Sequence, residues 1–226
     1  MMKTIKNNKI KLAFTMLELV MVIVVLGILG ALAIPRFDRD LNQEAADSIL
    51  SDIRYTQHIA LLDNKHKFDK SKWQRRFWKI MFGTCTGTDR FYMIGSDDDM
   101  SANNSSGFFS KSESITDPSN GKHMFWTNGI DCSNVKDTTI SDRIFITKKY
   151  GITNISTSGG CASNKYIGFD YLGRPRNGFA TSTTPNDASY MSTDCTFTFT
   201  MYDGTTFAIQ IDAETGYAFI VGQPNS

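Results

Sequence analysis

The sequence predicts an α+β protein in which one long N-terminal helix, with a transmembrane half and an amphipathic half, packs on an antiparallel β-sheet domain. Three observations predict this fold class. Residues 14–34 form an apolar run, residues 36–62 repeat apolar side chains at three- and four-residue steps, and residues 195–221 alternate apolar with polar side chains. With 226 residues and a net charge of +1, the chain has room for one soluble domain beyond the helix, and its charge implies no particular partner.

The apolar run is long enough to cross a bilayer. From Leu19 to Ile34 it contains no charged or strongly polar side chain. As a helix, residues 14–34 would extend roughly 31 Å, close to the thickness of a hydrocarbon core. The charged residues before Glu18 are all lysines, and such a basic segment keeps the N-terminus cytoplasmic. We therefore expect a transmembrane half at residues 14–34, with the rest of the chain translocated.

Glu18 does not fit an apolar helix, because an ionisable group at membrane depth costs several kcal/mol if it is unpaired. It is therefore a candidate functional residue. Two simpler explanations remain open. The run could be an ordinary secretory signal peptide, since residues 31–33 read Ala-Leu-Ala. It could also be a plain single-pass anchor, with Glu18 reaching toward the membrane interface.

A family resemblance rests on residues 1–35. A short basic leader, Ala13, the sequence Phe-Thr-Met-Leu-Glu-Leu and an apolar helix resemble the N-terminal signal of type IV pilins and type II secretion pseudopilins. The resemblance implies that a prepilin peptidase removes residues 1–13 by cutting between Ala13 and Phe14, and that Phe14 is then N-methylated. Glu18 falls on the glutamate of the family, and Pro35 on its helix-distorting proline. The family usually has glycine before the cut, where this chain has Ala13.

The resemblance also implies how such a chain would assemble. In a filament, the free amine of Phe14 in one subunit can pair with Glu18 of a neighbour, and a buried pair of this kind sets register more than stability. We expect Phe14, Glu18 and Pro35 to act in assembly. The implied partners are prepilin peptidase, other pilin or pseudopilin subunits and the membrane. The implied location is the bacterial inner membrane, with a single pass, a cytoplasmic N-terminus and a periplasmic C-terminal domain.

Residues 35–62 continue the helix in amphipathic form. Apolar residues such as Ile49 and Ile53 recur at helical spacing, and charged residues including Asp52 and Arg54 are assigned to the opposite face. Pro35 removes one backbone hydrogen bond and is expected to kink the helix. The apolar stripe is expected to pack on the domain formed by residues 63–226.

The domain of residues 63–226 reads as β-rich. Its clearest signal is the alternation at 195–202 and 205–211 around the turn residues Asp203 and Gly204. Residues 96–121 read as a long polar loop. Parts of residues 166–175 and 209–218 loosely resemble the H-type minor pseudopilin branch. Expected strands lie at residues 73–85, 90–95, 143–148, 165–172, 195–202, 205–211 and 217–221.

The four cysteines all follow the apolar run. Their spacing contains no C-x-x-C pair and the chain has three histidines, which argues against a zinc site. Two disulfides are the natural interpretation in an oxidising compartment. Three connectivities are possible, and buried free thiols are the alternative. We favour the pairs Cys85–Cys132 and Cys161–Cys195.

Residues 65–79 interleave cations with aromatic residues, a pattern that can bind a nucleic-acid backbone while rings stack on bases. In a strand, the same pattern can be an ordinary solvated face over a core. The candidate nucleic-acid residues are Lys72, Arg75, Arg76 and Lys79.

No cofactor is predicted. Asp97, Asp98 and Asp99 could bind calcium, an ion that some pseudopilins use, but they lack the spaced donors of a recognisable calcium loop. No catalytic motif is found, so an enzyme is not expected. The sequence therefore predicts a pilin-like structural subunit, a minor pseudopilin or pilin, of a type II secretion pseudopilus or type IV pilus. The alternative is a DNA-binding minor pilin of a DNA-uptake pilus.

Overall fold

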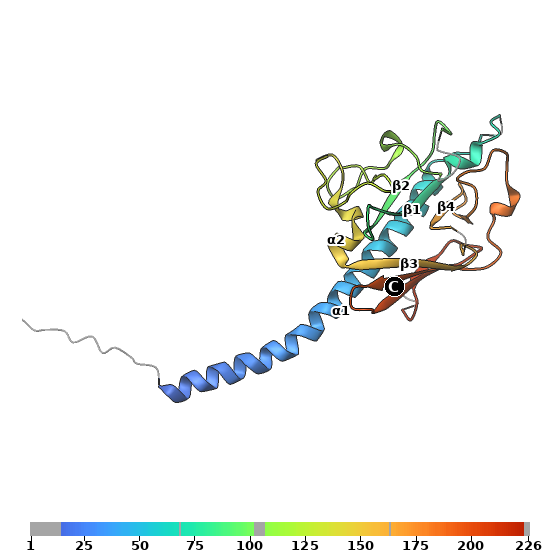
Figure 1. Ribbon diagram of the computed structural model, residues 1–226. Helices are drawn as coiled ribbons and strands as arrows, with labels where there is room; N and C mark the ends of the chain where they lie inside the picture. Colours follow the sequence, from blue (N-terminus) through green and yellow to red (C-terminus); the bar gives the residue numbers. More distant parts are fainter. Residues whose placement is uncertain (1–14, 68, 102–106, 163, 224–226) are drawn as a thin grey trace, which may run out of the picture. The chain divides into compact units, whose positions relative to one another are not determined.

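The computed structural model describes residues 15–67, 69–101, 107–162 and 164–223, and within residues 31–40 it describes the backbone without the side chains (Figure 1). Ala13 and Phe14, the predicted processing residues, lie outside the described residues. The chain divides between Asp40 and Leu41 into two compact units.

Helix α1 (Met16–Leu62) contains 47 residues and is drawn in blue in Figure 1. Pro35 lies within its helical backbone. The first part of α1 belongs to the N-terminal unit, and the part from Leu41 onward belongs to the second unit.

The predicted transmembrane half is wrong. Among the residues that the structure describes, no helix is long and apolar enough to cross a membrane. This finding contradicts the predicted fold class. It also contradicts the predicted single-pass location in a bacterial inner membrane, with a cytoplasmic N-terminus and a periplasmic C-terminal domain.

The second unit contains two four-stranded antiparallel sheets, which also corrects the expectation of one β-sheet. The first sheet has the order β2-β1-β4-β5 and the second has the order β3-β6-β7-β8. The number of sheets could not be foreseen because pairing depends on partners far apart in the sequence. The strands are β1 (Trp78–Thr84), β2 (Arg90–Gly95), β3 (Ile152–Gly159), β4 (Tyr166–Phe169), β5 (Pro175–Arg176), β6 (Cys195–Met201), β7 (Thr206–Ile211) and β8 (Ala218–Ile220).

The β6–β7 hairpin follows directly from its sequence. Side chains along β6 alternate between buried and half-buried positions, as a strand with one face on the core requires. At the turn, Gly204 has a φ of +83°, a conformation that favours glycine. Asp203 stabilises the turn because its Oδ1 accepts hydrogen bonds from the backbone N–H and the hydroxyl of Thr205, at 2.8 and 2.7 Å.

Short helical segments occupy two places where strands were expected. A 3₁₀ turn precedes β1, and residues 142–150 form a 3₁₀ turn followed by α2. Gly151 ends α2 with a φ of 80°, and its N–H donates to the carbonyl of Thr147 at 2.8 Å. The segments at these two places are η1 (Trp73–Arg76), and η3 (Asp142–Ile144) with α2 (Ile146–Tyr150). Two further 3₁₀ turns, η2 (Lys111–Glu113) and η4 (Asp187–Ser189), lie in other parts of the described chain.

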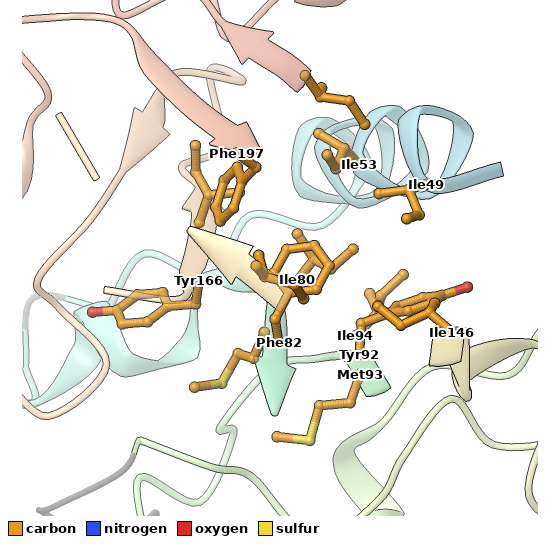
Figure 2. Close-up of a cluster of buried hydrophobic side chains, with 14 of the residues drawn as sticks. Ile49, Ile53, Ile80, Phe82, Tyr92, Met93, Ile94, Ile146, Tyr166 and Phe197 are labelled. Atoms are coloured by element: carbon orange, nitrogen blue, oxygen red, sulfur yellow. The ribbon is translucent and has the colours of Figure 1, made fainter. Parts of the chain in front are cut away.

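The core of the second unit joins both sheets and the C-terminal part of α1. Figure 2 shows Ile49 and Ile53 of α1 close to side chains of β1, β2 and β6. The ring of Phe82 on β1 lies 5.2 Å from the ring of Phe197 and 5.5 Å from that of Phe199, both on β6. These contacts connect the first sheet to the second in one buried cluster.

Candidate functional site

The N-terminal part of α1 is an exposed apolar surface. Consecutive residues are apolar, so the helix has no polar face there and has apolar side chains on all sides. Their exposed fractions range from 45% at Val22 to 83% at Met16. Burial of this surface therefore needs contacts around the whole helix. The large apolar side chains are Met16, Leu17, Leu19, Val20, Met21, Val22, Ile23, Val24, Val25, Leu26, Ile28 and Leu29.

Glu18 lies in the first turn of this helix. The hydroxyl of Thr15 accepts a hydrogen bond from the backbone N–H of Glu18 at 3.3 Å, and the carbonyl of Thr15 accepts one from Leu19 at 3.2 Å. Thr15 is therefore an N-cap residue. The Glu18 side chain is exposed, and a carboxylate in the first turn interacts favourably with the helix dipole. Glu18 thus has a local structural role in addition to its predicted role in assembly.

The cations of the basic segment do not share one surface. Arg75 is buried and donates to the carbonyls of Ser182 and Thr181, at 2.7 and 2.9 Å. Lys79 is fully buried, and its Nζ donates to the carbonyl of Arg75 at 2.7 Å. Burial lowers the pKa of Lys79 to about 8, although the charge of Asp97 raises it.

The remaining candidate residues of the basic segment, Arg76 and Lys72, are both half-buried. Arg76 forms an ion pair with Asp98 at 3.1 Å, and Lys72 is half-buried beside η1. Trp73 is buried and stacks on the ring of His66 at 3.8 Å. The DNA-binding alternative stays a prediction, and these positions do not support it.

Three acidic side chains gather near the end of β2. Carboxylate oxygens of Asp97, Asp99 and Glu113 lie within 4.8 Å of one another. Calcium prefers six to eight oxygen ligands. However, Glu113 already accepts hydrogen bonds from Ser110 N at 2.8 Å and from Asp99 N at 3.1 Å, and Asp98 pairs with Lys65 at 3.0 Å. Calcium binding therefore stays a prediction.

The structure pairs the cysteines as favoured from the sequence. Cys85, just after β1, is bonded to Cys132, with Cα atoms 5.8 Å apart. Cys161, just after β3, is bonded to Cys195 at the start of β6, with Cα atoms 5.2 Å apart. The first bridge attaches a long irregular segment to the first sheet, and the second closes one end of the β3–β6 pair.

Sequence analysis missed a buried cluster around Asp52. Asp52 was assigned to the polar face of α1, yet its side chain is 3% exposed. Its Oδ1 lies 2.6 Å from Nη2 of Arg143, and its Oδ2 accepts a hydrogen bond from the hydroxyl of Tyr92. Burial raises the pKa of Asp52 to about 6, while the Arg143 charge lowers it. The helical spacing could have predicted this burial. Asp52 is three residues after the buried Ile49, so it lies beside the buried apolar stripe of α1.

Asp117 is the second acid of the cluster. Its Oδ1 lies 3.6 Å from Nη1 of Arg143 and accepts from the Ser119 hydroxyl at 2.7 Å. Its Oδ2 accepts from the Ser141 hydroxyl at 2.6 Å and from Asn120 Nδ2 at 3.1 Å. Burial raises the pKa of Asp117, but the hydrogen bonds from Ser141 and Ser119 outweigh it and leave this pKa below the ordinary value.

A pocket of about 560 Å³ adjoins the cluster. It is lined by Ser119, Asn120, Asp142, Arg143, Lys148 and Lys149.

Comparison with other proteins adds no relative. No family model matches the chain, and no match was found among curated proteins or solved structures.

Proposed function

We propose that this chain is a structural subunit of a filament, of the pilin or pseudopilin type, and that it packs against other subunits through residues 16–30 of α1. The single observation that supports this proposal most strongly is the exposed apolar surface of Met16–Leu29. No enzymatic role is proposed.

The size of this surface favours association. Complete burial of one large apolar side chain contributes about 1.5–3 kcal/mol. The twelve large side chains from Met16 to Leu29 are each roughly half exposed or more, so burying them would contribute on the order of 10 kcal/mol or more. This is comparable to the entropic cost of association, about 4–15 kcal/mol.

The distribution of the apolar residues favours a bundle over a dimer. A dimer covers one side of a helix, whereas this helix is apolar on all sides. A filament core with several neighbouring helices around each one would bury the whole surface. The second unit, with its own buried core and two disulfides, would remain folded as a separate body.

Glu18 gives such a bundle its register. Inside an apolar bundle, a carboxylate must be paired or neutralised. Cleavage before Phe14 would create an amine four residues away, and the amine of a neighbouring subunit could pair with Glu18. A pair of this kind would select one axial offset between helices.

The test begins with the N-terminus of the mature protein. Mass spectrometry of chains from cells with and without prepilin peptidase should show a start at methylated Phe14 only with the enzyme. A start at Ile34 in both strains would instead indicate cleavage after Ala31-Leu32-Ala33 by an ordinary signal peptidase, and would contradict the proposal.

Association is tested separately by cysteine cross-linking. The four native cysteines are all in disulfides, so an introduced thiol reports only its own surroundings. Val22→Cys should give cross-linked multimers, whereas Lys136→Cys, at an exposed position of the domain, should not. Monomers alone from Val22→Cys would contradict packing through this segment. In the same background, Glu18→Gln should reduce the yield of multimers.

A further inference from the structure

The pocket beside the Asp52 cluster has no role in the proposed assembly. It belongs entirely to the second unit, and its volume of about 560 Å³ is sufficient for a small organic ligand. Its polar lining comes from three parts of the chain: the turn at residues 119–120, η3 with Arg143, and α2 with Lys148 and Lys149.

Two residues that line the pocket, Ser119 and Asn120, are held in place by hydrogen bonds. Asp117 accepts from the side chains of Ser119 and Asn120, and its carboxylate lies 3.6 Å from the guanidinium of Arg143. Preorganised polar groups lose little freedom on binding a ligand. The two lysines on α2, Lys148 and Lys149, are exposed and also line the pocket, and Nζ of Lys149 lies 4.9 Å from the centre of the Tyr150 ring.

We propose that this pocket binds an oxyanion ligand, with a carboxylate or tetrahedral phosphate-like group held by Arg143, Lys148 and Lys149, and that Asp52 competes with the ligand for Arg143. Arginine suits this role because its planar guanidinium binds oxyanions through paired N–H groups. Nη1 of Arg143 lies 3.6 Å from Asp117, and Nη2 is already taken by Asp52, at 2.6 Å. A ligand oxygen would have to share or replace that contact.

The local charge explains the competition. The three cations Arg143, Lys148 and Lys149 are opposed by three acids, Asp52, Asp117 and Asp142. When every acid is ionised, these charges cancel and the pocket attracts anions weakly. Loss of the Asp52 charge would leave one net positive charge beside Arg143. In this proposal, Arg143 pairs either with the internal carboxylate of Asp52 or with an oxyanion of the ligand.

The competition should depend on pH. Burial raises the pKa of Asp52 to about 6. Asp52 is faced by Arg143 of η3, by Tyr92 of β2 and by the more distant Asp117. The pKa of Tyr55 on α1 is raised by burial and also by the charge of Asp52. The pKa values of Tyr92 and Tyr55 are raised, and that of Asp117 is lowered, so these groups keep their charge state between pH 5.3 and 7.5. Asp52 alone in this group would change charge, and anion binding should strengthen at the lower pH.

Calorimetric titration of the full chain in a nonionic detergent tests the proposal. The probes are inorganic sulfate, a tetrahedral oxyanion, and oxalate, a dicarboxylate, because each keeps nearly constant charge between pH 5.3 and 7.5. Preference for one of them identifies the class of the natural ligand. Wild-type chain should bind the preferred probe about tenfold more tightly at pH 5.3 than at pH 7.5.

Asp52→Asn separates competition from other effects of pH. Asparagine keeps the shape and can still accept from Tyr92, but it removes the charge. This variant should bind the probe at pH 7.5 about as tightly as wild-type chain does at pH 5.3. If its affinity at pH 7.5 equals that of wild-type chain, competition by Asp52 is excluded.

The binding site itself is tested by substituting exposed lysines, because such substitutions leave the folded core intact. The double variant Lys148→Gln and Lys149→Gln should lose most binding at both pH values. The matched double variant Lys67→Gln and Lys70→Gln, also at exposed lysines, should bind as wild type. Equal affinity of the two double variants, or no binding of either probe by any chain, would overturn the site. The outcome is independent of the proposed filament assembly.

Discussion

The two units of the chain use the same kinds of residue in opposite ways. In the second unit, core side chains such as Phe199 and Ile209 are fully buried, whereas Leu26 of the N-terminal unit is 62% exposed. The second unit buries its apolar residues against its own sheets and helix. The apolar side chains of the first unit have no such partner among the described residues.

This difference is clearest in matched truncations. Phe199→Ala should reduce the free energy of unfolding of the second unit by about 3–5 kcal/mol, because it creates a cavity between stacked rings. Leu26→Ala should change it by less than about 0.5 kcal/mol. Denaturant unfolding followed by near-ultraviolet circular dichroism measures both. A similar loss from Leu26→Ala would mean that the apolar helix is part of the folded core.

The second-largest effect concerns the disulfides. Replacing Cys161 and Cys195 together by alanine should destabilise the second unit by about 2–4 kcal/mol, since the bridge closes a loop with a sequence separation of 34. Cross-linking through Val22→Cys should be unaffected, because the bridge lies in the other unit. An unchanged unfolding midpoint would indicate that the bridge does not form. Intact mass before and after reduction provides the control.

The pH dependence of the free energy of unfolding should reveal the raised pKa of Asp52. Its pKa is raised by burial from 3.8 to about 6 in the folded protein, so the folded state binds a proton more readily than the unfolded state. The contribution of Asp52 to stability should therefore fall as pH rises from about 4 to 6, by at most about 3 kcal/mol.

The matched variant for this measurement is Asp52→Asn, which does not titrate. The difference in unfolding free energy between wild type and Asp52→Asn should favour wild type more at pH 4.5 than at pH 7.5. The opposite sign would mean that the ion pair with Arg143, 2.6 Å away, outweighs burial.

The smallest expected effect is in the N-terminal unit. Thr15→Ala removes the side chain that caps α1 and should cost about 0.5–2 kcal/mol of local helix stability. Hydrogen exchange of residues 16–20 should accelerate, while exchange in the second unit stays the same. Thr15→Ser keeps the hydroxyl and serves as the control. Equal exchange in the two variants would show that the cap contributes nothing.

Local patterns predicted part of the fold well. The strand expected at 195–202 is confirmed as β6 (Cys195–Met201), and the strand expected at 205–211 is confirmed as β7 (Thr206–Ile211), because alternation is a local property of one buried face. The prediction that residues 73–76 belong to a strand was wrong. These residues form a 3₁₀ turn, in which the side chains of Gln74 and Arg75 form hydrogen bonds with the backbone of residues 181–186. The polar strand β3 was not expected, because Ile152–Gly159 contains few apolar residues.

Sequence pattern misjudged the N-terminal helix for a different reason. Residues 14–34 were interpreted as a membrane span from length, hydropathy, the basic segment before them and a family resemblance, and the finding on the described residues contradicts that interpretation. What the pattern could predict was a helix without a polar face. It could not show what surrounds that helix, because apolar side chains pack against lipid or protein by the same forces.

By itself, the sequence determined the apolar helix at the N-terminus, the alternating hairpin at the C-terminus and, through cysteine number, the capacity for two disulfides. Only the tertiary structure decided that β1 and β6 belong to different sheets, that Arg75 and Lys79 are buried, and that Asp52 meets Arg143. The physical reason is the distance along the sequence over which each interaction acts. Periodicity and turn chemistry act between residues a few positions apart, whereas Asp52 and Arg143 are 91 positions apart and meet only when the whole core is assembled.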